Sequence, residues 1–234
     1  MMIVCQVCHT ENNHLAITCK TCRGFLQARI ENLDLFRVAW NVIERPRRAF
    51  HLVAVAQHKN YSLLLASIAG MAFVFFFFWV IKAGEYSESL INILAAGAVT
   101  GPPIGLVVVL LYATCSKVVS RFSGVGVSLW QLYAVASYSL VPVVISAILV
   151  LPIELMTFGI FFFTKNPSPY LLKPVSYGVM LALDGAFGMW SLCLLTIGMR
   201  TLFDERWPTT FLRVLVSLGI VVGAVVAVVW HFGP

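Results

Sequence analysis

Four cysteines near the N-terminus form two C-x-x-C pairs, Cys5 and Cys8 in CQVC and Cys19 and Cys22 in CKTC, with ten residues between the pairs. Each pair can present two thiolates from one tight turn, and four thiolates can close a tetrahedron around zinc. A segment this short buries too little apolar surface to fold by itself, so bound metal would supply most of its folding free energy. The spacing predicts a small zinc ribbon over residues 1–26, with zinc as its cofactor.

The same cysteines allow two other chemistries. The stretch CQVCH, residues 5–9, matches the C-x-x-C-H pattern of c-type haem attachment, but that pattern gives Cys19 and Cys22 no role. A disulfide or a redox switch would also use these cysteines, although cytosolic thiols are normally kept reduced. With four thiols available, we expect His9 and His14 at the surface rather than among the ligands.

A second candidate for chemistry is Asp184, which interrupts an otherwise uncharged run in MLALDGAFGMW. A carboxylate within a membrane is costly and is by default a candidate functional residue. It would relay protons, bind a cation, or accept a structural hydrogen bond from Tyr138, Ser176 or Tyr133. We therefore predict an intramembrane polar site at Asp184 and Tyr138, and we expect Glu154 near the outer interface, within reach of water.

Apolar helices must position these residues. The 234-residue chain is 60% apolar and only 11% charged, whereas about a quarter of the residues of a soluble domain are charged. Its uncharged intervals are about as long as the roughly twenty residues that a helix needs to cross a bilayer. We predict an all-α integral membrane protein in which a small four-cysteine zinc ribbon and amphipathic connector helices precede five transmembrane helices. The membrane domain covers residues 61–234, with spans at about 61–81, 90–114, 130–152, 175–199 and 213–231.

Residues 153–164 are harder to place. Their uncharged part, LMTFGIFFFT, is too short to cross the membrane alone. Pro152 is expected to break the preceding helix. The segment is therefore re-entrant or interfacial, or belongs to a sixth span, and we favour an extension of the third span.

The distribution of Lys and Arg predicts the orientation. No apolar stretch typical of a secretory signal peptide is found in the first 22 residues. With five spans, eight basic residues precede the first span, two separate the second from the third, and three separate the fourth from the fifth; only Lys82, Lys165 and Lys173 fall on the other side. The positive-inside rule then places the N-terminus in the cytoplasm and the C-terminus outside. This topology accounts for the net charge of +6, so we predict no nucleic-acid partner.

Residues 27–60 form the connector, which we predict to be two amphipathic helices separated at Pro46. Asn32 is available as the N-cap of the first helix. Apolar residues recur along one face of that helix: Leu33, Phe36, Trp40 and Ile43. We expect Arg45, Arg47 and Arg48 to lie near anionic lipid head groups on the membrane surface. The alternative is a soluble helical hairpin packed on the end of the bundle.

The second span contains GAVTGPPIG, which puts Gly97, Gly101 and Gly105 on one helical face. Small residues at this spacing let two helices approach closely. Pro102 and Pro103 are expected to bend or break the same helix. We favour tight helix packing over a transport site at this motif.

Three stretches together carry a resemblance to a known family: WNVIERPRRAF at residues 40–50, YSLVP at 138–142, and the W-x-L-x-L-x-x-x-G run at 190–198. In this order, and with five spans, they resemble the prokaryotic members of the YIP family, the Ypt/Rab-interacting protein domain, over about residues 40–230. The resemblance implies a five-helix fold in a prokaryotic cytoplasmic membrane. Eukaryotic members act in vesicle traffic and contact small GTPases, but the prokaryotic members supply no settled activity to carry over. The N-terminal ribbon is similar to short zinc ribbons of bacterial membrane proteins, except at His9, where Gly is common.

No arrangement of nucleophile, base and oxyanion donors is apparent, so we predict no catalytic residues and no enzyme. The first hypothesis is a scaffold or membrane-organising protein that contacts the lipid bilayer and docks an unknown protein partner through the ribbon. One alternative is a small transporter or channel that uses Asp184. Another is a metal or redox sensor.

Overall fold

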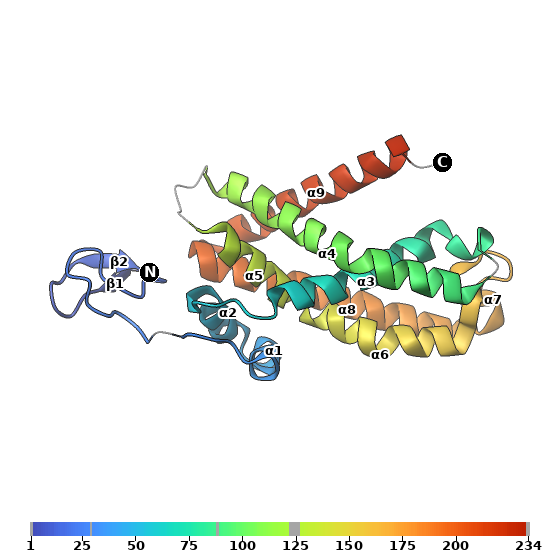
Figure 1. Cartoon of the computed structure of the whole chain (residues 1–234), viewed down its shortest axis with the longest axis horizontal. Coiled ribbons are helices and arrows are strands. Elements are labelled where there is room, and N and C mark those ends of the chain that lie inside the picture. The colour runs from blue at the N-terminus through green and yellow to red at the C-terminus, as the bar shows by residue number, and fades with distance from the viewer. Residues whose placement is uncertain (1, 29, 88, 122–126, 233–234) are drawn as a thin grey trace. The chain divides into compact units, whose positions relative to one another are not determined.

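The computed structural model describes residues 2–28, 30–87, 89–121 and 127–232 (Figure 1). Arg29, one of the eight basic residues counted before the first span, lies outside these ranges, as do Met1 and residues 233–234 at the ends of two predicted domains.

Five helical segments are long and apolar enough to cross a membrane: Ser62–Ile81, Leu90–Ser120, Leu129–Phe163, Pro174–Phe203 and Trp207–Ala227. The prediction of an all-α integral membrane protein with five spans is therefore confirmed. The segments are formed by α3 (Ser62–Ile81), α4 (Leu90–Arg121), α5 (Leu129–Ser139) with α6 (Val141–Phe158) and η2 (Gly159–Phe163), α8 (Pro174–Phe203), and α9 (Trp207–Phe232). Two short elements, η1 (Ala83–Glu85) and α7 (Pro169–Leu172), lie in the connections.

The third span extends past residue 152, as we favoured, but the helix does not break at Pro152. Helix α6 continues through Pro152 to Phe158, and η2 extends the segment to Phe163. A helix broken in a bilayer would leave carbonyls without water to bind, which favours continuation despite the cost of the proline. The α-helix is instead interrupted at Leu140, between α5 and α6. Helix α6 ends before Gly159, whose positive φ of 58° suits a residue without Cβ.

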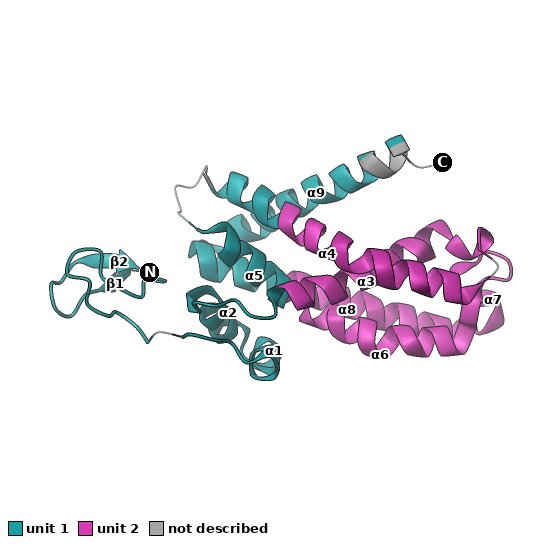
Figure 2. Ribbon diagram, viewed as in Figure 1, with its two compact units in different colours: residues 1–62, 112–138, 194–234 teal, residues 63–111, 139–193 magenta. Residues whose placement is uncertain are grey.

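The chain divides into two compact units (Figure 2). Unit 1 comprises residues 1–62, 112–138 and 194–234, and unit 2 comprises residues 63–111 and 139–193. Helices α4 and α8 each contribute to both units. Each unit has buried side chains of its own, so the two are described separately.

In unit 1, α2 (Pro46–Val55), α5 and the end of α8 pack around Phe50. A Cβ at Gly198 of α8 would lie 2.5 Å from Val135 of α5 and 3.1 Å from Phe50, so the backbones meet closely there. The carbonyls that end α2 are satisfied from outside the helix. Lys59 Nζ donates to three of them, at Val53, Ala54 and Ala56, over 2.7 to 3.1 Å.

In unit 2, a mostly aromatic hydrophobic core contains Phe75, Ile93, Phe158, Phe162 and Phe163. The predicted close approach at the glycine motif of α4 is confirmed, and α3 is the helix that approaches. A Cβ added at Gly105 would overlap the carbonyl oxygen of Ala66 and lie 2.6 Å from the Cα of Gly70. Of the bend or break expected at Pro102 and Pro103, the break does not occur, because α4 remains helical through both.

The connector contains the two predicted helices, α1 (Leu35–Glu44) and α2, and Pro46 opens the second. Asp34, not Asn32, caps α1: its Oδ1 accepts from the amide of Arg37 at 2.7 Å. The residues predicted to share one apolar face of α1 differ in their burial. Leu33 is buried together with Val38 and Val42, whereas Phe36 and Trp40 are exposed.

Candidate functional site

The four N-terminal cysteines lie together. Strands β1 (Met2–Val4) and β2 (Glu11–Asn13) pair antiparallel, and the isolated bridge between Thr18 and Phe25 closes the second turn. This brings Cys5 Sγ to 3.5 Å from Cys22 Sγ, and Cys8 Sγ to 3.5 Å from Cys19 Sγ.

All four sulfur atoms lie within 4.8 Å of one another. Zn–S bonds of about 2.3 Å in a tetrahedron require sulfur atoms about 3.8 Å apart. The cluster can therefore hold a metal ion. Haem attachment at CQVCH does not explain why Cys19 and Cys22 join the other two cysteines.

The surroundings favour the thiolate form at two of the four cysteines, Cys8 and Cys19. At Cys22 the Gly24 amide lowers the pKa, but hydrogen bonds with Cys8 and Cys5 outweigh it and raise the pKa to about 12. The amides of Cys22 and Thr21 point at Cys19 Sγ and lower the pKa of Cys19 to about 6. A hydrogen bond with Thr10, at 3.3 Å, lowers the pKa of Cys8. Backbone amides directed at sulfur are typical of knuckles that hold metal ions.

Asn12 is a residue of this site that the sequence did not single out. It is buried, and its Nδ2 donates to Thr10 O at 2.8 Å while its Oδ1 accepts from the amide of Lys20 at 2.9 Å. The same Nδ2 lies 3.5 Å from Cys19 Sγ. One side chain thus ties the first knuckle to the second. The only sequence signal was a polar residue at an inward position of a short strand.

The histidines differ from each other in role. His9 follows the first C-x-x-C pair and has a positive φ of 55°, which explains why glycine is common at this position of similar ribbons. His14 Nε2 lies 2.8 Å from the carbonyl oxygen of Thr201 in α8 and links the ribbon to the helices of unit 1. The metal-binding group among the described residues consists of the four cysteines alone.

Asp184 has partners other than those expected. Ser146 of α6 donates a hydrogen bond to Asp184 Oδ1, and Glu154 of the same helix lies close to Asp184. Glu154 is only 3% exposed, so its side chain is not open to water as we expected. The hydroxyl of Tyr138 donates to Asn60 O at 2.7 Å within unit 1, and Asp184 belongs to unit 2.

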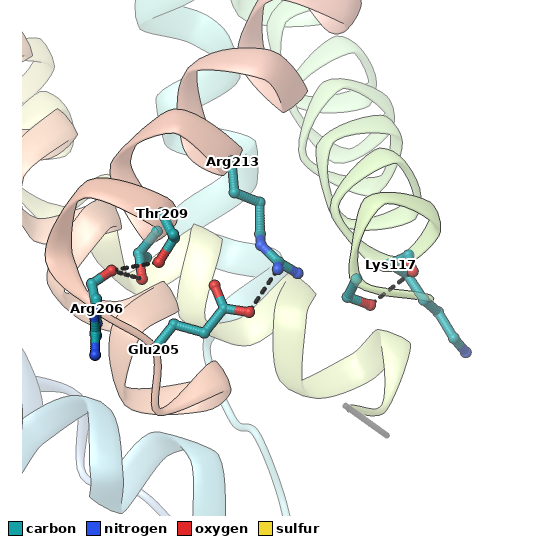
Figure 3. A network of polar contacts seen from close by, with 7 residues as sticks. Lys117, Glu205, Arg206, Thr209 and Arg213 are labelled. Atoms are coloured by element: carbon teal, nitrogen blue, oxygen red, sulfur yellow. Dashed lines mark hydrogen bonds and ion pairs between the residues drawn. The ribbon is translucent and has the colours of Figure 1, made fainter. Parts of the chain in front are cut away.

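A buried ion pair joins the start of α9 to the turn that precedes it (Figure 3). Arg213 Nη2 donates to Glu205 Oε1 at 2.6 Å, and the guanidinium lies 4.5 Å from the ring centroid of Phe203. Arg213 is 9% exposed and lies inside the fifth span, which begins at Trp207. The fifth span was predicted from about residue 213 because Arg213 was taken as a boundary; the helix α9 begins at Trp207, and Glu205 neutralises the charge of Arg213.

The basic residues of the connector lie where α1 meets α2. Arg45, Arg47 and Arg48 are exposed. Phe36, also exposed, is at 84% the most accessible aromatic side chain of α1. Cationic and aromatic side chains on one amphipathic segment are typical of helices that lie on a membrane surface.

Comparison with known proteins identifies the family. The model of the Yip1 domain matches residues 40–230, from within α1 to near the end of α9. No curated protein and no solved structure matches the chain. The match covers all five spans and leaves the cysteine ribbon outside. The chain, an integral membrane protein, therefore belongs to the Yip1 domain family.

Proposed function

We propose that the protein is a non-enzymatic membrane scaffold that docks a protein partner through a zinc ribbon on its cytoplasmic side. The observation that carries the proposal is the cluster of four thiols within 4.8 Å, held in a segment that precedes the family domain. Tetrahedral thiolate ligation with no open position is typical of structural zinc, which shapes a surface rather than performs a reaction.

The ribbon presents an apolar surface suited to docking. Val7 and Phe25 are each 76% exposed, although both belong to a segment with almost no core. Val7 and Phe25 belong to neighbouring parts of the metal site. A Cβ placed on Gly24, the residue before Phe25, would lie 3.9 Å from Val7 Cγ2. We call this pair the ribbon surface. Exposed apolar side chains on a rigid knuckle form a contact surface for a protein with a complementary apolar patch.

The connector supports the position of the ribbon at the membrane. Val38 and Val42 of α1 are buried in unit 1, and Phe36 and Trp40 remain exposed for contact with lipid. Arg45, Arg47 and Arg48 then face anionic head groups, which attract each cation with about 1 kcal/mol. The ribbon would thus be held close to a prokaryotic cytoplasmic membrane.

The orientation has its own test. A biotin-ligase acceptor tag before Met1 is expected to be biotinylated by cytoplasmic ligase, while the same tag after Pro234 is not, because an odd number of spans separates the two ends. A tag in the loop that contains Lys165 serves as the external control. Biotinylation of both terminal tags would contradict the five-span orientation.

Docking is tested by removing the ribbon surface while keeping the metal. The double substitution Val7→Ser and Phe25→Ser should abolish cross-linking to the partner in native membranes, because it removes the exposed apolar contact and no thiol. Bound zinc, measured as metal per chain, should stay at the wild-type level.

The matched control is Leu171→Ser in α7, a residue that is also exposed and apolar but lies in unit 2. It should retain every partner of the wild type. If the ribbon-surface variant and Leu171→Ser cross-link to the same proteins in the same amounts, the ribbon is not the docking module.

A further inference from the structure

A cavity of about 470 Å³ lies within unit 2, where α3, α6 and α8 surround it. This volume is in the range of sites for small organic molecules. Most of its wall is apolar, and much of it is aromatic: Phe73, Phe75, Phe76, Trp79, Phe162 and Phe187. The indole of Trp79 is already satisfied, because its Nε1 donates to Tyr177 OH at 3.1 Å.

The polar groups of the cavity are concentrated at one place. Ser146, Glu154 and Asp184 all line it, and Ser146 of α6 donates a hydrogen bond to Asp184 of α8. The cavity therefore combines a large apolar wall with a single, strongly polar, acidic end.

No positive charge balances this acidic end from the wall. The residues that line the cavity, all within the described part of unit 2, include no Lys, Arg or His. In a surrounding of low polarity, attraction between opposite charges is much stronger than in water. The electrostatic complement of Glu154 and Asp184 is therefore a cation that enters from outside.

The lining selects the kind of cation. Calcium takes six to eight oxygen ligands and magnesium six, but this wall offers two carboxyl groups and two hydroxyls, and the hydroxyl of Tyr177 already accepts from Trp79. Aromatic faces instead attract ammonium groups and pack against apolar carbon. We propose that the cavity binds an organic ammonium ion with an apolar body, with its nitrogen at Glu154 and Asp184 and its carbon skeleton against the aromatic wall.

The wall at α8 leaves room for entry. Gly185 and Gly188 line the cavity and are exposed, and a Cβ at either position would meet nothing within 4 Å. Because α8 crosses the membrane, a lipophilic amine dissolved in the bilayer can approach this opening. The glycines keep it clear of side chains.

The test uses the full chain in nanodiscs of zwitterionic phosphatidylcholine, with 4-phenylbutylammonium as the probe and neutral 4-phenylbutanol as its analogue. Empty nanodiscs correct for partition into lipid. The ammonium is expected to bind saturably at one site per chain. The alcohol should bind with an affinity at least about tenfold lower, because it cannot form the charge-assisted hydrogen bonds. In the variant with Glu154→Gln and Asp184→Asn, this preference should disappear.

A second pair of variants keeps the carboxyl groups and tests the cavity itself. Gly185→Phe places a ring at the opening and should abolish binding of the ammonium. Gly178→Phe is the matched control on α8: its Cβ is equally unobstructed, but it does not line the cavity, so it should bind as the wild type does. This pair decides the question even if the carboxyl variant fails to fold.

Three results would overturn the proposal. They are equal affinity for the ammonium and the alcohol, which indicates a cavity for lipid chains; no saturable binding to the wild type; and wild-type affinity in Gly185→Phe.

Discussion

Replacing Cys19 and Cys22 together by serine is expected to reduce bound zinc from one ion per chain to background and to unfold the ribbon. The two remaining thiols cannot close a tetrahedron, and structural zinc contributes roughly 10–16 kcal/mol to the folding of such small segments. Apart from Asn12, the ribbon has few buried side chains beyond its own cysteines. Loss of the metal should therefore leave residues 2–26 open to proteases. Metal content by mass spectrometry and limited proteolysis measure the two effects.

The spans should stay inserted in this variant, because the five hydrophobic helices lie outside residues 2–26. Serine at both Cys115 and Cys193, the two cysteines outside the ribbon, is the matched control and should keep full zinc. Wild-type zinc in the variant at Cys19 and Cys22 would show that other groups ligate the metal. A haem absorption band in the wild type would instead restore the interpretation of CQVCH as an attachment site.

The ribbon shows what spacing can and cannot predict. Two C-x-x-C pairs predict that four thiols meet, because each tight turn fixes its two cysteines and one metal ion accommodates both turns. The role of Asn12 was not predictable in this way. Its hydrogen bonds join Thr10 to Lys20, and that contact exists only once β2 has placed Asn12 between the turns.

Hydropathy predicts the spans because every backbone group in a bilayer must be satisfied within the helix. The same principle explains why the helices do not break at Pro102, Pro103 and Pro152. Rules for proline derive largely from helices in water, where a freed carbonyl can bind solvent. In these apolar segments no water replaces the lost bond, so α4 and α6 continue.

The partners of Asp184 depend on which helices are neighbours. Periodicity shows which residues share one face of a helix, but it does not show which face of another helix lies opposite. The sequence suggested Tyr138, Ser176 or Tyr133, whereas the partner in the structure is Ser146. The helix is interrupted at Leu140, between α5 and α6, and Tyr138 belongs to unit 1 whereas Ser146 belongs to unit 2.

The second large effect is expected at Gly105, where α3 and α4 approach most closely. Gly105→Leu should prevent this packing, because a Cβ there overlaps Ala66 O and lies within 3 Å of the backbone of Gly70. No side-chain rotamer relieves a clash between Cβ and backbone, so the cost should exceed the roughly 1–3 kcal/mol of ordinary overpacking. The measurement is the SDS mole fraction at which purified protein unfolds in mixed micelles.

Gly219→Leu in α9 is the control, because a Cβ at Gly219 meets nothing within 4 Å. Both substitutions make a span more apolar, so neither should impair insertion. A difference in unfolding between them therefore reports helix packing alone. Association of helices within a bilayer depends on close van der Waals contact, since lipid is as apolar as the side chains. If Gly105→Leu unfolds at the same SDS mole fraction as Gly219→Leu, the contact of α4 with Gly70 does not stabilise unit 2, and the glycine motif has another role.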